Sequence, residues 1–134
     1  LSDKGAAKGL LDAGYLSAIE KLAAKFADIF PVEKPSLLHG DLWSGNFMVA
    51  PDGLAAIYDP AIYYGHREMD IAMTLLFGGF DREFYAAYHY HYPLQNGWET
   101  RVELCQLYPL LVHLLLFGGH YRSSVIEIIR KYAV

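Results

Sequence analysis

The sequence predicts a mainly α-helical domain that carries one small β-hairpin. Three observations lead to this fold class. Apolar residues recur at helical spacing in several separate stretches, and a Pro-Asp-Gly turn separates two short apolar runs. In addition, 54% of the residues are hydrophobic and 19% are charged, which is typical of a globular chain. With 134 residues, the chain is long enough for one compact domain and too short for two ordinary ones.

The first predicted helix covers residues 9–30. Its apolar residues fall on one helical face: Leu10, Leu11, Leu16, Ile19, Leu22, Ala23, Phe26 and Ile29. Pro31 and Pro35 are expected to end it, since proline lacks the N–H that a helix interior needs. A short apolar pair, Leu37 and Leu38, then leads into the polar loop HGDLWSGN at residues 39–46.

A β-hairpin is predicted directly after this loop. Residues 47–49 and 54–58 are apolar runs, and Pro51, Asp52 and Gly53 between them are typical turn residues. The hairpin would fold the chain back on itself, so we expect Asp59 to lie beside Asn46.

The remainder of the chain is predicted to be helical. A helix beginning near Arg67 should end at Gly78-Gly79, and Asp81 is expected to cap a second helix that reaches about Tyr90. A third helix is predicted over residues 98–117, where Pro109 should kink or break it, and a last one over residues 121–132.

Charge and composition exclude several classes of partner. The formal net charge is −4 and no run of Lys or Arg occurs, which argues against a nucleic-acid or membrane-surface binder. The most apolar stretch, residues 104–119, is shorter than the ~20 residues of a membrane span. Cys105 is the single cysteine and is expected to be a small buried hydrophobe, which is compatible with a reducing, cytoplasmic location.

Four polar residues between positions 39 and 59 are typical of phosphoryl transfer. That reaction needs an oriented acceptor hydroxyl, a fixed Mg²⁺ ion and neutralised charge. Asp41 suits the hydroxyl, whereas the oxygens of Asn46 and Asp59 suit Mg²⁺, a hard ion that prefers oxygen ligands. His39 is expected to hold the loop by hydrogen bonds rather than to act on substrate.

The alternative is that these residues merely make turns. Asp and Asn are ordinary turn residues in a Gly-containing loop, and the spacing His-x-Asp-x₄-Asn alone is weak support for a site. The addition of Asp59 after a hairpin favours a functional site. Zinc is not expected at the histidines, because His89 and His91 point to opposite sides of a helix and no cysteines assist.

The same residues carry a resemblance to a known family. The segment HGDLWSGN resembles the catalytic loop of aminoglycoside phosphotransferase-like kinases, which are relatives of the protein kinases. Together with DPAIYYGHREMDIAMT at residues 59–74, it resembles the fructosamine kinase (ketosamine 3-kinase) family. The likeness continues through LLFGGF and QLYPLLVHLLLFGGHY, and so covers most of the chain beyond Leu37.

The resemblance implies a fold and an activity. Residues 1–134 would form the C-terminal lobe of a protein kinase-like fold, and the cofactors would be ATP and Mg²⁺. The reaction would be ATP-dependent phosphorylation of the sugar moiety of a small ketosamine or a glycated protein. Asp41 matches the catalytic aspartate of the family, and Asn46 with Asp59 matches its metal- and cofactor-binding pair. Asp70 matches an acidic residue that supports the catalytic loop.

Other residues are assigned weaker roles. Glu68 is expected to be a first-turn helix carboxylate that the helix dipole favours. The remaining candidates for substrate contact are Tyr63, Tyr64, Trp98, His113 and His120. Nothing before residue 9 offers the phosphate-covering loop, lysine and glutamate of a complete kinase of this type. We therefore expect a fragment that lacks the N-terminal ATP-gripping lobe and is inactive alone.

Two other functions remain open. The first is a kinase for another small hydroxyl acceptor, such as an aminoglycoside, choline or homoserine. The second is a non-catalytic binding module that keeps the kinase-like fold. The sequence does not determine the physiological acceptor or the oligomeric state.

Overall fold

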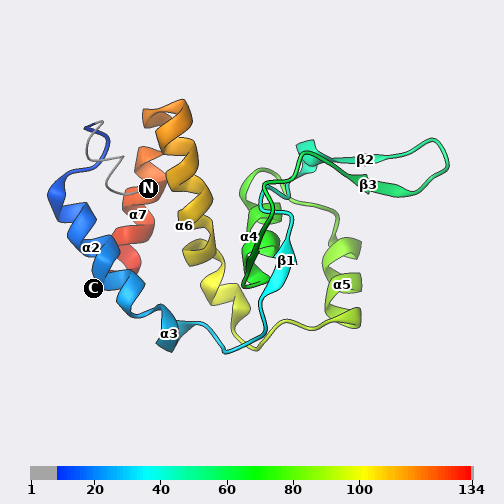
Figure 1. Cartoon of the computed structure of the whole chain (residues 1–134), viewed down its shortest axis with the longest axis horizontal. Helices are drawn as coiled ribbons and strands as arrows, with labels where there is room; N and C mark the ends of the chain where they lie inside the picture. The colour runs from blue at the N-terminus through cyan, green and yellow to red at the C-terminus, as the bar shows by residue number, and fades with distance from the viewer. Residues whose placement is uncertain (1–8, 134) are drawn as a thin grey trace. The chain divides into compact units, whose positions relative to one another are not determined.

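The computed structural model describes residues 9–133, and these form two compact units. The terminal unit combines the start of the chain up to Val32 with the residues from Gln106 onward, whereas the central unit is Glu33–Cys105. Helices dominate both units, and the strands belong to two small antiparallel sheets (Figure 1). The mainly α fold class predicted from the sequence is confirmed.

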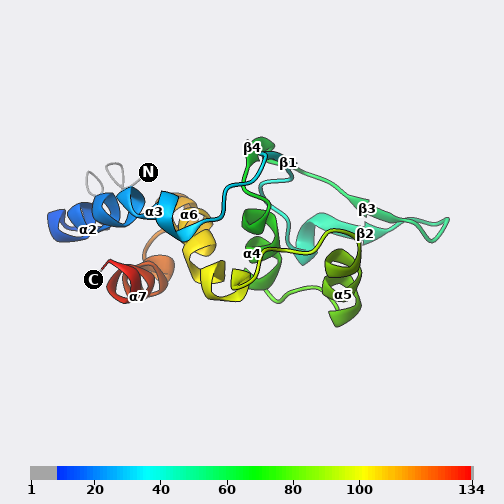
Figure 2. The same cartoon turned by 90° about the horizontal axis from the view of Figure 1, so that it is seen from below.

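The terminal unit is helical throughout. It contains α2 (Ala13–Ala24), α3 (Phe26–Ile29), the C-terminal part of α6 (Trp98–Phe117), the 3₁₀ turn Gly119–Tyr121 and α7 (Arg122–Tyr132). Helices α2 and α7 lie side by side (Figure 2), and the side chain of Arg130 on α7 donates a hydrogen bond to the Tyr15 hydroxyl on α2 (3.2 Å). The buried side chains of this unit include Leu22, Leu114, Val125 and Ile129.

The single helix predicted over residues 9–30 is wrong in two places. It begins only at Ala13, because the Asp12 side chain caps it by accepting a hydrogen bond from the Tyr15 N–H (3.2 Å). It is also interrupted at Lys25, beyond which α3 forms a separate short turn. Phe30 is extended, as expected for a residue that precedes proline, so the predicted end of the helix is confirmed.

The central unit contains all four strands. Strand β2 (Phe47–Val49) pairs with β3 (Ala55–Ile57) across the predicted turn. In Figure 1 this hairpin extends beyond α4 (Glu68–Leu76) and α5 (Arg82–His91). A second sheet was not predicted. It pairs β1 (Ser36–Leu38) with β4 (Tyr63–Gly65), with Leu37 opposite Tyr64. The polar loop therefore begins at the end of one sheet and leads into the other.

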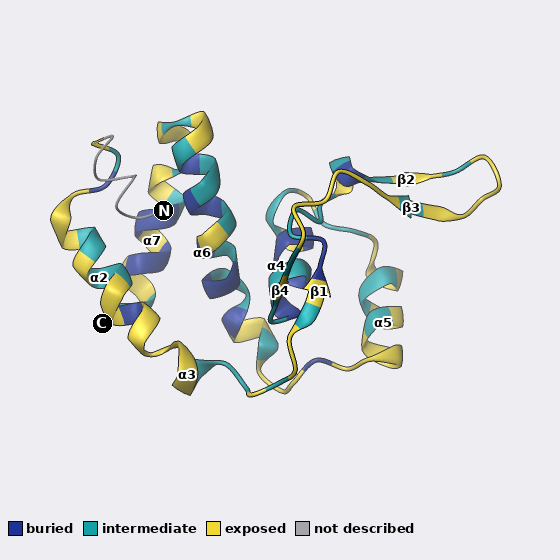
Figure 3. Ribbon diagram, viewed as in Figure 1, coloured by how far each residue is buried: buried dark blue, intermediate teal, exposed yellow. Residues whose placement is uncertain are grey.

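The helices of the central unit follow the predicted order. They are α4 (Glu68–Leu76), α5 (Arg82–His91) and the first part of α6 (Trp98–Phe117). Asp81 occupies the N-cap position of α5, but its side chain makes no capping hydrogen bond, so only the position is confirmed. Helix α6 runs unbroken through Pro109, so the break considered there is wrong, because a proline removes only one backbone hydrogen bond of this 20-residue helix. Figure 3 shows buried residues on α4 and α7, whereas the β2–β3 hairpin is largely exposed.

Helix α6 is longer than the apolar stretch that the sequence marks out. Among the described residues, it is the one helix long and apolar enough to cross a membrane by length and composition. A buried core helix meets the same criterion, and 39% of the apolar window of α6 is buried. Near its start, α6 carries Arg101, which is buried in an ion pair with Glu68. These features agree with a core helix.

The single cysteine provides a direct test of this packing. Cys105 is fully buried, and burial, with a smaller contribution from Glu68, raises the pKa of its thiol to about 12. Because the thiolate is the reactive form, native Cys105 should react with a thiol reagent at pH 8 at least about 10³-fold more slowly than an unfolded cysteine does. Absorbance after addition of Ellman's reagent measures the rate. Equal rates in buffer and in guanidinium chloride would contradict this burial.

Candidate active site

The polar loop is held in place by a carboxylate of α4. The backbone N–H of His39 donates to Asp70 Oδ2 (2.7 Å), and that of Gly40 donates to Asp70 Oδ1 (2.9 Å). The two carboxylate oxygens thus accept hydrogen bonds from two consecutive backbone N–H groups. Hydrogen bonds to a charged acceptor are stronger than hydrogen bonds between neutral groups. This geometry agrees with the supporting role that the resemblance implies for Asp70.

His39 connects the loop to the residue before Asp59. Its side chain is buried, its Nε2 lies 3.0 Å from the Tyr58 carbonyl oxygen, and its Nδ1 accepts a hydrogen bond from the Asp41 N–H (3.3 Å). A carbonyl can only accept and a backbone N–H can only donate, so the ring carries its proton on Nε2. Both ring nitrogens are occupied by backbone groups, which agrees with the predicted holding role.

Gly40 brings the segment after Asp59 against the loop. The Ala61 N–H donates to the His39 carbonyl (2.8 Å). Gly40 has φ 81°, and a Cβ atom there would lie 2.1 Å from the Ala61 carbonyl oxygen. Only glycine fits both the backbone conformation and the close approach. Backbone contacts therefore hold residues 39–46, which include Asp41 and Asn46, against residues 59–61, which include Asp59.

Asp41 and Asn46 are directly linked. The Asn46 Nδ2 group donates to the Asp41 carbonyl oxygen (2.9 Å) and to Asp41 Oδ2 (3.0 Å). Because both partners can only accept, the Asn46 carboxamide is oriented with its nitrogen toward Asp41. Neither Asn46 Oδ1 nor Asp41 Oδ1 accepts a hydrogen bond from the described residues. One oxygen of each side chain is therefore available to a ligand.

The hairpin returns the backbone next to Asp59 to Asn46, as predicted. The Tyr58 N–H donates to the Asn46 carbonyl (3.1 Å), and the Tyr58 hydroxyl donates to the Gly45 carbonyl (2.7 Å). Asp59 follows directly, with an exposed side chain that has no hydrogen-bond partner among the described residues. Its φ of 55° is positive, a conformation that costs a non-glycine residue about 1–3 kcal/mol and is concentrated at functional sites.

The available donors fit a magnesium ion. Asn46 Oδ1 and the Asp59 carboxylate are hard oxygen ligands, and Mg²⁺ is commonly held by one or two protein oxygens together with substrate phosphates and water. Residues 9–133 contain no cluster of three or more His, Cys, Asp and Glu side chains that could hold a metal without such help. The donor set therefore suits a metal that arrives with a phosphate-bearing ligand.

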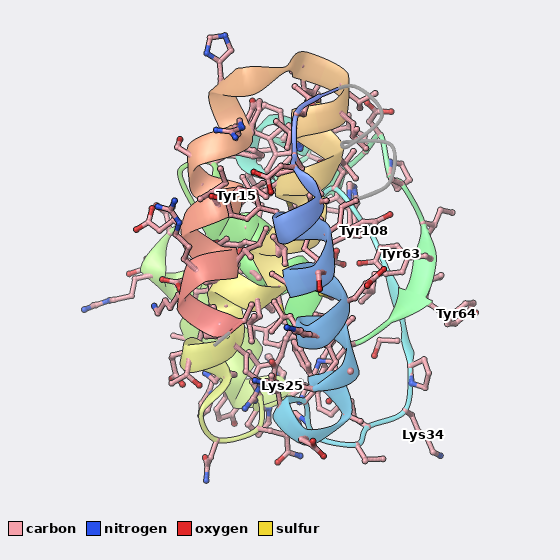
Figure 4. The ribbon with its side chains drawn as sticks, turned by 90° about the vertical axis from the view of Figure 1, so that its left-hand side faces the viewer. Tyr15, Lys25, Lys34, Tyr63, Tyr64 and Tyr108 are labelled. Carbon is pink, nitrogen blue, oxygen red and sulfur yellow. The ribbon has the colours of Figure 1, made fainter. Side chains whose placement is uncertain are left out.

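Aromatic side chains border the loop. The Trp43 ring lies over Gly45, where a Cβ atom would approach it to 2.3 Å, and it makes an edge contact with Phe77 at 6.2 Å between ring centroids. The Tyr63 ring lies against Gly40, whereas Tyr64 is 73% exposed and points away from β4 (Figure 4). Tyr63 is thus the nearer of the two tyrosines to the loop. The roles of Trp98, His113 and His120 stay predictions.

One buried ion pair was not predicted from the sequence. Glu68 is only 3% exposed, and Arg101 donates to both of its carboxylate oxygens, from Nε (2.8 Å) and Nη2 (2.6 Å). These hydrogen bonds to Glu68 raise the pKa of Arg101 above its ordinary value. Glu68 does lie in the first turn of α4, as expected, but its burial and its ion pair with Arg101 were not predicted. The GHRE segment gave no signal of a partner 33 residues away.

Comparisons with known proteins show a family likeness over most of the chain. The family model described as fructosamine kinase matches residues 3–134. A Staphylococcus aureus protein named a probable ketoamine kinase is 50% identical over 127 residues, a match that covers 93% of this chain and 44% of the relative. The ketosamine-3-kinase of Mus musculus is 48% identical over 98 residues, which cover 72% of this chain and 31% of the relative.

Solved structures extend the likeness to the fold. A Thermobifida fusca protein, provisionally titled a fructosamine-3-kinase, matches with a TM-score of 0.87 and 40% identity over 96% of this chain and 45% of its own. A Haemophilus somnus protein with the same provisional title matches with a TM-score of 0.80 and 32% identity, over 97% and 44% of the two chains. The chain thus spans less than half the length of these relatives.

Proposed function

The chain belongs to the fructosamine kinase family, and from this premise we propose that it forms the catalytic-loop lobe of a ketosamine kinase. The reaction is transfer of a phosphoryl group from ATP to a sugar hydroxyl of a small ketosamine or a glycated protein. The observation that carries the proposal is the grouping of Asp41, Asn46 and Asp59, with one unengaged oxygen on each of the first two and a partner-free carboxylate on the third.

Asp41 is proposed to orient the acceptor hydroxyl and to accept its proton. Its Oδ2 is held by Asn46, so Oδ1 is the oxygen that can face a substrate. A carboxylate fixed in this way acts mainly by positioning, because phosphoryl transfer requires little covalent chemistry from the protein. Asp70 and His39 support Asp41 indirectly by holding the backbone on either side of Gly40.

Asn46 Oδ1 and the Asp59 carboxylate are proposed to hold Mg²⁺. When bound with ATP, the ion would neutralise charge on the phosphates as the phosphoryl group leaves. The exposed position of Asp59 leaves its carboxylate accessible to such a ligand. A cytoplasmic location is part of the same expectation.

The proposed domain arrangement follows from the lengths of the relatives. This chain matches 44% of the S. aureus relative, and residues 9–133 contain no β-rich segment with a lysine that could grip ATP. We assign the ATP-gripping lobe to the part of the relatives that the chain does not match. The chain alone should therefore turn over little or no substrate.

A chimera provides the direct test of activity. In it, this chain replaces the residues that it matches in the S. aureus relative, and the unaltered relative is the positive control. We expect Mg²⁺-dependent phosphorylation of a fructosamine or ribulosamine, measured by ADP release and by ³¹P NMR of the product. Kanamycin, choline and homoserine should be phosphorylated much more slowly, since a site built to hydrogen-bond one acceptor discriminates against others.

Each remaining alternative predicts a different result in the same assay. A preference for kanamycin, choline or homoserine would assign the chain to another small-molecule kinase. Absence of Mg²⁺-dependent nucleotide binding in a folded chimera, while the control binds, would favour a non-catalytic module. The isolated chain should be inactive in every case that supports the proposal, and turnover at about 1–10³ s⁻¹, the ordinary enzyme range, would overturn the two-lobe arrangement.

A further inference from the structure

The buried ion pair between Glu68 and Arg101 lies at the N-terminus of α4, the helix whose Asp70 holds the catalytic loop. Glu68 is the first residue of α4, and Asp70, two residues later, accepts both hydrogen bonds from the loop backbone. Arg101 comes from the first half of α6, within the same compact unit. Two short charge-assisted hydrogen bonds at one carboxylate thus connect α4 to this part of α6.

Arg101 is itself held in one orientation. Besides the two bonds to Glu68, its Nη1 group donates to the Asn96 carbonyl (3.4 Å) and its Nη2 group to the Gln95 carbonyl (3.3 Å). The planar guanidinium therefore bonds to a carboxylate on one side and to the segment that precedes α6 on the other. A compact ammonium group cannot reproduce this arrangement, because it lacks the fixed fork of donors.

The neighbouring arginine does not compete for Glu68. Arg67 is also buried, but it donates to Glu33 and to the carbonyls of Tyr92 and Pro93, and its guanidinium lies 3.8 Å from the Tyr92 ring centroid. Two adjacent residues of opposite charge thus have separate partners. Glu68 depends on Arg101 alone for its charge compensation among the described residues.

We propose that Arg101 is a positioning residue for phosphoryl transfer. Acting through Glu68 and the first turn of α4, it places the Asp70 carboxylate under the backbone N–H groups of His39 and Gly40. It thereby sets the position of Asp41 at the next residue. The predicted effect on kcat rests on the proposed function. The predicted effect on the loop backbone at His39 and Gly40 can be measured without any activity.

A role in stability alone would make a different prediction. Replacing a buried ion pair by apolar side chains of similar volume is often neutral or stabilising, whereas removing one partner leaves a buried charge uncompensated. The double variant Glu68→Met/Arg101→Met therefore separates the two roles. If the pair only stabilises the fold, this variant should retain both its midpoint of unfolding and its kcat.

The proposal predicts a selective loss in the chimera. For Glu68→Met/Arg101→Met, kcat should fall by about 10–100-fold, since displacement of a reacting group by about 1 Å can cost 10² in rate. The KM values for ATP and ketosamine should change by less than about threefold, because uniform substrate binding is not altered. Amide hydrogen exchange at His39 and Gly40 should become faster, since these are the two N–H groups that Asp70 holds.

Two further variants keep the test decisive. Arg101→Lys preserves the charge but not the two-point contact, and should show an intermediate loss of kcat together with faster exchange at His39 and Gly40. Val125→Ala removes buried volume from α7 in the terminal unit and serves as the control for lost stability, with normal kcat and normal exchange at the loop. If the double variant does not fold, kcat and amide exchange of Arg101→Lys decide the test.

The inference is overturned if the loop amides exchange at the parental rate in both Arg101 variants, or if kcat stays within about threefold of the parent. An inactive but folded parent chimera would instead count against the proposed function. In that case the exchange rates of His39 and Gly40 alone decide whether Arg101 positions the loop.

Discussion

Replacing Asp41 by asparagine in the chimera is expected to lower kcat by about 10²–10⁴-fold, the usual contribution of a positioned general base. Asparagine keeps the shape of the side chain but cannot accept the hydroxyl proton. Its carboxamide can present an oxygen to Asn46 Nδ2, so the loop should remain folded. Affinity for Mg·ATP should be little changed, because Asp41 faces the acceptor rather than the metal.

Steady-state kinetics with a ketosamine, together with nucleotide titration, measure both quantities. Asp52→Asn is the matched control, since Asp52 is a carboxylate of the same segment that only accepts a hydrogen bond from the Leu54 N–H in the hairpin turn. It should leave kcat within about twofold of the parent. A kcat for Asp41→Asn close to that of the Asp52 control would remove Asp41 from the reaction.

Replacing Asp59 by glycine should abolish Mg²⁺-dependent nucleotide binding and at the same time stabilise the protein. The carboxylate is the only charged ligand of the proposed metal pair, so its loss should eliminate the effect of Mg²⁺ on ATP affinity. Asp59 also has φ 55°, which glycine adopts without steric cost. Relief of that strain should increase the free energy of unfolding by about 1 kcal/mol.

Asp59→Ala is the informative comparison. Alanine also removes the ligand but retains the steric cost of a Cβ at positive φ, so it should lose Mg²⁺ dependence without the gain in stability. Calorimetric titration with ATP in Mg²⁺ or EDTA, and chemical unfolding of each variant, separate the two effects. An alanine variant that is more stable than the glycine variant by about 0.4–1 kcal/mol, the entropy difference of the unfolded chains, would show that no strain is stored at Asp59. Retained Mg²⁺ dependence would exclude Asp59 as a ligand.

The parts of the fold with a strong local signal could be predicted. The Pro-Asp-Gly turn predicted the β2–β3 hairpin, and with it the return of Asp59 to Asn46, because both strands are adjacent in sequence. Helix α6 has the predicted bounds, since its apolar residues recur over many turns. For Asp70, the supporting role came from the family resemblance, whereas its two hydrogen bonds required coordinates.

Features that depend on distant residues could not be predicted. Strands β1 and β4 have three residues each, too few to show an alternating pattern, and they pair across the whole loop and hairpin. Glu68 has the position of an ordinary helix N-terminal carboxylate, and its burial depends on Arg101, 33 residues away. Asp12 sets the start of α2 by accepting a hydrogen bond from the Tyr15 N–H, and the apolar periodicity on both sides of Asp12 hid this start in the sequence.

The central claim is that Asp41, Asn46 and Asp59 form one site for phosphoryl transfer. The most direct test is a crystal structure of the chimera with Mg²⁺, a non-hydrolysable ATP analogue and a ketosamine. We predict a metal about 2.0–2.1 Å from Asn46 Oδ1 and from an Asp59 oxygen, with an Asp41 oxygen about 2.6–3.2 Å from a sugar hydroxyl. A metal bound without Asn46 and Asp59, or a sugar bound away from Asp41, would contradict the central claim.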